Sequence, residues 1–202
     1  AMSPVFLGEA TVFLHANDEK QIKDGVKFLQ DQKIKNIVVV GGTNSLEASD
    51  FMSTNNIKIA LEQPHNLPSM EDEDVKSRFR LASQLINKGV TVAVDPTGAM
   101  TRMNTRNLPF FAGSFSAYGV EKEKAVETIT LNAAKVLGIE DNYGSIEVGK
   151  SATLFISHGD ALDMRTNNLS HAYIDGRELS LETNQTKLWQ RYKKKVEEEK
   201  SN

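Results

Sequence analysis

The sequence contains no cysteine. Disulfide bonds, thiolate metal sites and cysteine nucleophiles are therefore excluded, and the composition is compatible with a reducing compartment. No apolar run approaches the length that spans a bilayer, so we expect no membrane segment. The first four residues do not form a basic region followed by an apolar stretch, which is the pattern of a signal peptide. These absences favour a cytoplasmic protein.

Positive charge is not in excess either. Lysine and arginine number 24 against 27 aspartate and glutamate residues, which gives a formal net charge of −3. No basic stripe marks the part of the chain that is expected to fold, so nucleic acid is not an expected partner. The one basic run, 193–195, lies beside the acidic run 197–199, and this pattern is typical of a solvated helix face.

Four apolar runs rich in valine and isoleucine alternate with segments of helical periodicity. Parallel strands that are covered on both faces have this composition, so the order predicts four β/α units. Four units make half of an eight-stranded barrel or a small open sheet. The runs are TVFLH at 11–15, NIVVV at 36–40, IKIAL at 57–61 and VTVAV at 90–94, and further helices are expected at 108–118 and 121–137.

The pattern changes after residue 138. Asp175-Gly176 is a hairpin turn signal between short apolar stretches. We predict three parts, namely a half barrel over 1–138, a small β domain over 139–181 and a C-terminal helix over 182–202. The strands expected in the small domain are 145–148, 152–157, 169–174 and 177–180, and the apolar face of the helix consists of Leu188, Trp189, Tyr192 and Val196.

Three motifs in the second half of the chain occur in a fixed order. They are AVETITLNAAKVLGI at 125–139, GSIEVGKSATL at 144–154 and AYIDGR at 172–177. This combination resembles the closing segment of the amidohydrolase superfamily, in particular its imidazolonepropionase-like branch. The resemblance implies that the first motif is the last barrel helix beside the active-site end, and that the other two belong to a small β domain.

The resemblance extends backwards over nearly the whole chain. The segment 13–16 looks like the family's fifth barrel strand, which ends in a metal-binding histidine, and 90–95 looks like the eighth, which ends in a catalytic aspartate. The family hydrolyses C–N bonds with one or two divalent ions, usually zinc, that activate water and polarise the carbonyl group. The resemblance therefore implies that His15 and Asp95 bind metal, and that Asp95 also carries a proton from water to the leaving nitrogen.

The family's ligand set is incomplete in this sequence. Its first and fourth strands normally supply further metal ligands, whereas the resemblance begins at the fifth strand. The sixth strand normally ends in histidine, but Val40-Gly41-Gly42 stands there. A catalytic zinc ion needs three protein ligands and a water, so His15 and Asp95 cannot complete a site in one chain. We expect the isolated chain to be inactive.

The other polar candidates have simpler interpretations. His65 lies in a loop bounded by prolines and is expected to be exposed to solvent, while His158 and His171 are not expected to bind metal. The segment 41–44 lacks a P-loop lysine, so a plain turn is favoured over an anion site. His15 could bond to loop backbone, and Asp95 could organise a turn because it precedes Pro96.

Three functions are compatible with these observations. The chain could be part of an amidohydrolase that acts on a small amide, cyclic amide or peptide-like molecule. It could be a degenerate, non-catalytic binding or assembly module, or a small open-sheet binding protein, which the motif at 144–154 argues against. A half barrel would expose strand edges near Val12 and Val92, so we expect a homodimer or association with a separate N-terminal half.

Overall fold

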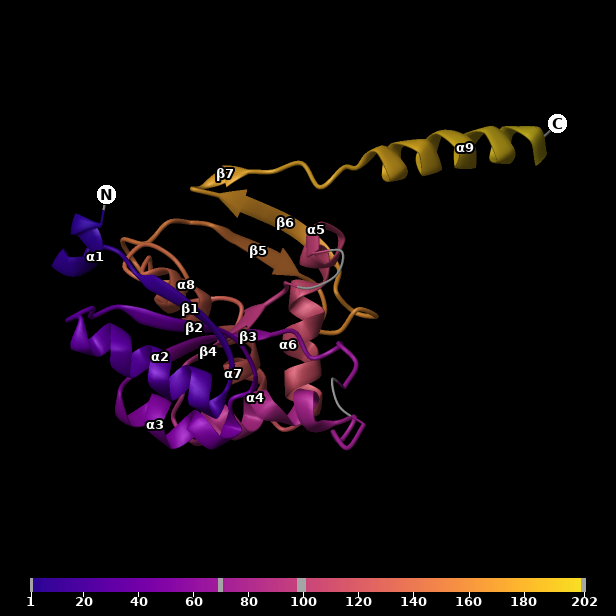
Figure 1. Ribbon diagram of the computed structural model, residues 1–202. Helices are drawn as coiled ribbons and strands as arrows, with labels where there is room; N and C mark the ends of the chain where they lie inside the picture. The colour runs from indigo at the N-terminus through magenta and orange to yellow at the C-terminus, as the bar shows by residue number, and fades with distance from the viewer. Residues whose placement is uncertain (1, 69–70, 98–100, 201–202) are drawn as a thin grey trace.

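A four-stranded parallel β-sheet forms the centre of the computed structural model, which describes residues 2–68, 71–97 and 101–200 (Figure 1). The strand order β1-β2-β3-β4 follows the sequence. All three neighbouring pairs are parallel, which confirms the predicted β/α alternation. The strands are β1 (Val12–Asp18), β2 (Ile37–Asn44), β3 (Lys58–Glu62) and β4 (Val92–Asp95).

Helices connect these strands and cover the sheet. Figure 1 shows α2, α3 and α4 together on one side of it. Asp18 caps the N-terminus of α2, because its Oδ1 accepts a hydrogen bond from the Gln21 amide at 3.1 Å. The helices are α1 (Ser3–Leu7), α2 (Glu19–Asp31), α3 (Ser49–Thr54), α4 (Ser77–Asn87), α5 (Thr101–Asn104), α6 (Leu108–Ala117), α7 (Lys122–Glu127), α8 (Leu131–Leu137) and α9 (Asn184–Lys200), with single 3₁₀ turns at Leu46–Ala48 and Thr105–Asn107.

The two faces of the sheet pack against different helices because side chains alternate along each strand. On one face, Val39, Ile59 and Val92 belong to the main core together with residues of α2, α3, α4 and α6. On the other face, Val38 and Ala93 form a smaller cluster with residues of α8. We call this second surface the α8 face.

Helix α8 covers only the first half of the α8 face. Its Val136 packs against residues near the beginnings of the strands. The Lys58 ammonium group donates to the carbonyl oxygen of Lys135 at 2.8 Å, near the C-terminal end of α8, where the helix dipole favours a cation. The carboxyl ends of β3 and β4 lie beyond this cluster, and the residues there on the α8 face are Glu62 and Asp95.

The predicted exposure of the edge near Val92 is wrong. The Val94 amide donates to the carbonyl oxygen of Thr128 at 3.0 Å, and Asn132 Nδ2 donates to the carbonyl oxygen of Val92 at 3.1 Å. Val92 and Thr128 are both fully buried. Thr128, between α7 and α8, and Asn132 of α8 thus bond to two outward backbone groups of β4. The predicted single helix over 121–137 is interrupted at 128–130.

A second, antiparallel sheet contains β5 (Leu154–Ser157), β6 (Leu169–Ile174) and β7 (Arg177–Glu178). The predicted hairpin is confirmed, since Asp175 and Gly176 have φ angles of 49° and 77° between β6 and β7. The predicted strand at 145–148 is wrong. That segment turns instead, because Gly144 and Gly149 have φ angles of 94° and 98° and the Lys150 amide bonds to the carbonyl oxygen of Glu147.

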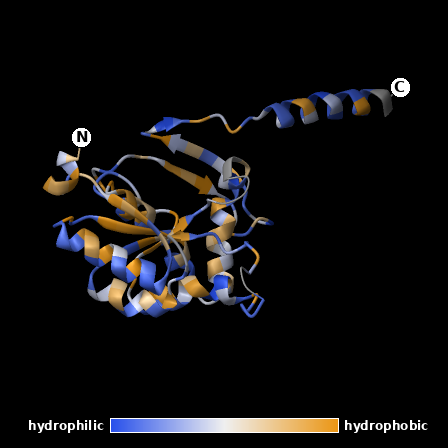
Figure 2. Ribbon diagram, in the orientation of Figure 1, coloured by the Kyte–Doolittle hydropathy of each residue, from blue (hydrophilic) through white to orange (hydrophobic). Residues whose placement is uncertain are grey.

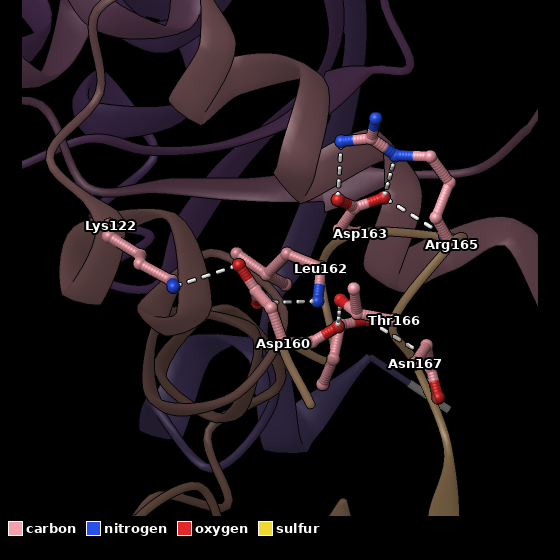
Figure 3. Close-up of polar contacts among 8 residues, drawn as sticks. Lys122, Asp160, Leu162, Asp163, Arg165, Thr166 and Asn167 are labelled. Atoms are coloured by element: carbon pink, nitrogen blue, oxygen red, sulfur yellow. Dashed lines mark hydrogen bonds and ion pairs between the residues drawn. The ribbon is translucent and has the colours of Figure 1, made fainter. Parts of the chain in front are cut away.

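The loop between β5 and β6, residues 158–168, packs against α6 at Gly113 and is joined to α7 by an ion pair with Lys122 (Figure 3). Leu162 is only 7% exposed and belongs to the main core. The Lys122 ammonium group lies 2.8 Å from the Asp160 carboxylate, and this hydrogen bond is the largest cause that lowers the pKa of Asp160. We call this loop the clasp. The predicted boundaries between the three parts remain a prediction.

Helix α9 extends away from the rest of the chain (Figure 1), and a helix was expected in this part of the sequence. Its surface alternates between hydrophilic and hydrophobic residues (Figure 2), and its large apolar residues are exposed. Lys193 and Lys194 each pair with a glutamate four residues later, at 3.8 and 3.9 Å. The described part of the chain contains no helix long and apolar enough to cross a membrane.

Candidate functional site

The polar residues of the α8 face gather at the ends of the strands. The register pairs Glu62 of β3 with Asp95 of β4, so both side chains project from the same face. His15 of β1 pairs with Val40 of β2. This position is in register with Ala60 and Ala93, so it lies two residues before Glu62 and Asp95 along the strands. The carboxyl ends of parallel strands are the usual place for a site in α/β proteins. This edge is therefore the candidate site.

Asp95 ends β4 and is 8% exposed. Its Oδ1 accepts a hydrogen bond from the Thr97 amide at 3.0 Å, and its Oδ2 accepts one from the Thr97 hydroxyl at 2.6 Å. Asp95 therefore organises the turn around Pro96, as the simpler interpretation predicted. Both carboxylate oxygens retain further lone pairs, so this turn also fixes the direction in which the carboxylate can accept a proton or a cation.

His15 does not end its strand as predicted, because β1 continues to Asp18. Its side chain is exposed, and no hydrogen bond of that side chain is found in the described part of the chain. Three strand spacings of about 4.8 Å separate β1 from β4, which places the backbones of His15 and Asp95 roughly 14 Å apart across the sheet. The sheet brings the two residues to one face but not into contact.

Strand β2, the expected sixth barrel strand, offers no metal ligand between His15 and Asp95. Its residues 41–44 were predicted as a plain turn, but they form the end of the strand. Gly42 has a φ angle of 64°, and a Cβ atom there would lie 2.3 Å from the Ile59 side chain. Among the residues that the structure describes, no group of three histidine, aspartate or glutamate side chains could hold a metal ion.

The loop after β3 contributes two polar residues that the sequence did not single out, Gln63 and Asn66. Gln63 is buried, and its amide group donates to Asn66 Oδ1 at 2.7 Å and accepts from the His65 amide at 2.8 Å. Asn66 in turn donates to the Glu62 carboxylate. The Gln63 backbone amide also donates to the carbonyl oxygen of Asp95 at 2.9 Å. This network orients Glu62 beside Asp95, and only the fold could reveal it.

His65 points to the outer helices rather than to the candidate site. Its Nε2 lies 2.7 Å from the Ser114 hydroxyl of α6, and its ring contacts the rings of Phe79 and Phe111 with centroid distances of 5.6 and 5.2 Å. Desolvation between these groups lowers the pKa of His65. The residue remains partly exposed, as predicted, but it anchors the loop after β3.

His171 lies in β6 of the small antiparallel sheet, and His158 directly follows β5. Both are exposed. His171 Nε2 lies 3.9 Å from Glu178 of the neighbouring strand, and its ring stacks on Tyr173. The prediction that neither residue binds metal stays a prediction.

The fold is an α/β fold with a parallel sheet and an acidic residue at the end of its last strand, and a family comparison identifies the class of protein. Residues 56–179 match the model of the amidohydrolase family. The match covers more than half of the chain, so the chain belongs to the amidohydrolase family. The predicted resemblance to the amidohydrolase superfamily is therefore confirmed.

Solved structures share the fold. A crystal structure of an amidohydrolase from Thermotoga maritima MSB8 superposes with a TM-score of 0.75 and 24% identity, over 88% of this chain and 45% of that one. A zinc-bound adenosine deaminase from Xanthomonas campestris superposes with a TM-score of 0.63 and 17% identity, over 96% of this chain and 52% of that one. The chain thus spans about half the length of these structures, and the match covers most of the described fold.

A curated relative supports the predicted branch over a short stretch. The imidazolonepropionase of Shewanella baltica (strain OS185) is 67% identical over 30 residues. These residues are 15% of this chain and 7% of that enzyme. The similarity is strong locally, but it covers a small part of either protein.

Proposed function

We propose that the chain takes part in the metal-dependent hydrolysis of a C–N bond in a small amide, cyclic amide or peptide-like molecule. The observation that carries this proposal is the position of Asp95, buried at the end of β4 and held by two hydrogen bonds from Thr97. Membership of the amidohydrolase family and the zinc in a structural neighbour support it.

The described residues do not complete a zinc site by themselves. Imidazole nitrogen and carboxylate oxygen are both suitable donors, but zinc in a catalytic site takes three protein ligands. His15 and Asp95 are two, on strands that are not neighbours. We therefore propose that the remaining ligands come from a second polypeptide segment, either another copy or the first four β/α units of a family chain, and that the isolated chain is inactive. A bound ion would supply polarisation of the carbonyl group and acidification of water.

The role of Asp95 follows from its hydrogen bonds. Because both donors come from Thr97, the carboxylate is fixed and presents its free lone pairs toward the open part of the α8 face. In that position it accepts a proton from the attacking water and returns it to the leaving nitrogen. His15, which is exposed on the same face, serves as a ligand.

A non-catalytic binding or assembly module is the second candidate. The specific observation in its favour is that no three-ligand group exists among the described residues. The two candidates predict different behaviour when the missing ligands are supplied.

The test combines zinc analysis with an assay of N-acyl amino acids and cyclic amides. The chain is measured alone and after co-expression with the first four β/α units of a family member. We expect zinc and hydrolysis only in the complex, with kcat lowered roughly 100- to 10,000-fold by Asp95→Asn. Asp163→Asn changes an acid in the clasp and serves as the matched control. Equal activity of the Asp95→Asn complex contradicts the proposed role, and a complex without zinc or hydrolysis favours the binding module.

A further inference from the structure

Ser114 and His65 form a hydrogen-bonded pair outside the candidate site. The Ser114 hydroxyl lies 2.7 Å from His65 Nε2, and this contact joins α6 to the loop after β3. The same hydroxyl lies 3.0 Å from the carbonyl oxygen of Phe110, one helical turn before it. A hydroxyl group has a single proton to donate, and the shorter of the two contacts is the one to His65. The pair therefore has the geometry of a nucleophile and its base.

Aromatic neighbours hold the imidazole ring in place. Its centroid lies 5.6 Å from that of Phe79 in α4 and 5.2 Å from that of Phe111 in α6. Neither neighbour nor Ser114 carries a charge, and desolvation between these groups lowers the pKa of His65. A lowered pKa keeps the ring neutral at pH 7, and a neutral imidazole has one nitrogen that accepts a proton. The neighbours thus supply the orientation and the protonation state of a general base.

Ser114 also lines a groove between α6 and the clasp, with a volume of about 380 Å³. Figure 3 shows the clasp side of this groove, where Lys122 meets Asp160. Small-molecule sites usually have volumes of about 300–1,000 Å³ and a largely apolar lining with a few polar groups. The apolar lining here consists mainly of Phe110, Leu162, Met164 and Ala117. A small apolar group attached to Ser114 therefore has a place to lie.

We propose that Ser114 is a nucleophile that takes up an acyl group from a small activated ester, with His65 as its general base. In this step Ser114 Oγ forms a bond to the acyl carbon, and the C–O bond of the ester breaks. The leaving oxygen keeps the bonding electron pair, and the hydroxyl proton passes to His65 Nε2. Because His65 is exposed, the ring then returns this proton to water. The acyl group stays on Ser114 in the groove.

The position of Ser114 within α6 determines how far the reaction goes. Residue 114 lies inside the helix Leu108–Ala117, so the backbone amides around it take part in the helix's own hydrogen bonds. These amides cannot form an oxyanion hole, which normally stabilises both the formation and the hydrolysis of an acyl ester. The pair therefore reacts with activated esters alone, and we expect a lasting acyl-serine rather than rapid turnover.

The test uses the whole chain with p-nitrophenyl acetate as the ester and EDTA present. Release of p-nitrophenolate gives the rate, and intact mass with peptide mapping locates the acetyl group. We expect one acetyl group per chain on Ser114, formed at a rate that falls as the pH falls through the lowered pKa of His65. His65→Gln should lower this rate roughly 100-fold or more, since a general base contributes about that factor.

Ser116→Ala is the matched control, because Ser116 lines the same groove and no histidine bonds to it in the described part of the chain. Ser114→Ala should abolish the acetylation, whereas Ser116→Ala should leave it unchanged. Circular dichroism checks that each variant is folded, and the peptide map of the native chain needs no variant. Acetyl groups on lysines with none on Ser114, or an unchanged rate in His65→Gln, overturn the proposal. Either result leaves the hydrolysis proposed for Asp95 untouched, since that function is tested with zinc in a complex.

Discussion

The carbonyl oxygen of Leu162 lies 2.3 Å from the position that a Cβ atom on Gly113 would occupy. Gly113 is in the middle of α6, and Leu162 is the buried tip of the clasp. The close approach of two backbones is possible only because the helix has no side chain at this point. The single glycine in α6 therefore determines how closely the small antiparallel sheet docks on the parallel one.

Gly113→Ala tests this docking. Alanine normally stabilises a helix by up to about 1 kcal/mol relative to glycine, but here the methyl group collides with backbone that cannot rotate away. We expect a net loss of about 1–3 kcal/mol in the free energy of unfolding, measured by urea denaturation. Gly25→Ala in α2 is the matched control, because the added methyl group meets the end of the flexible Leu14 side chain instead. Equal effects of the two substitutions would show that the clasp does not depend on Gly113.

The ion pair between Lys122 and Asp160 predicts a dependence on pH and salt. The hydrogen bond from Lys122 lowers the pKa of Asp160, so the folded chain binds this proton less readily than the unfolded chain. Its contribution to stability is present above the unfolded pKa of about 3.9 and is lost as the pH falls through the lower folded value.

Asp160→Asn should therefore weaken the clasp at pH 7 and low salt, and the difference from the native chain should shrink below pH 3 and in 1 M NaCl. Hydrogen exchange of residues 158–168 measures the effect locally. Because the pair is partly exposed, we expect a modest change. Asp175→Asn, at the hairpin turn, is the control. A difference that persists unchanged at high salt would contradict an electrostatic origin.

The sequence predicted the regular parts of this fold because they depend on local patterns. Valine-rich runs predicted the strands of the parallel sheet, and Asp175-Gly176 predicted the hairpin. The strand expected at 145–148 failed because its apolar residues are exposed in a turn set by flanking glycines. Local hydrophobicity alone does not distinguish an apolar strand from an apolar turn between two glycines.

The candidate site was less predictable, because it depends on contacts between distant segments. A resemblance to a family selected Asp95 and His15, but it gave no indication of the network of Gln63, Asn66 and Glu62. Those bonds exist only because the register aligns the end of β3 with the end of β4. Likewise, nothing in the motif at 125–139 indicates that Asn132 reaches the edge of a strand forty residues earlier.

His65 makes the stability of the loop after β3 dependent on pH. Desolvation lowers its pKa, so the folded chain favours the neutral ring. The unfolded chain takes up a proton as the pH falls through about 6.5, before the folded chain does, and stability is lost across that interval down to the folded pKa. The melting temperature should therefore fall between pH 7.5 and pH 5, and His65→Gln should reduce this fall. His171→Gln, on an exposed strand of the small sheet, should leave it unchanged.

Asn132→Ala tests how β4 is protected at its outer edge. The substitution removes the only side-chain donor described for the Val92 carbonyl oxygen, in a place where Val92 is fully buried. A buried acceptor without a partner costs about 1–3 kcal/mol, so the free energy of unfolding should fall by that amount. Asn168→Ala, whose side chain is exposed, is the control. A variant whose free energy of unfolding is unchanged would show that the bond from Thr128 is enough to protect this edge.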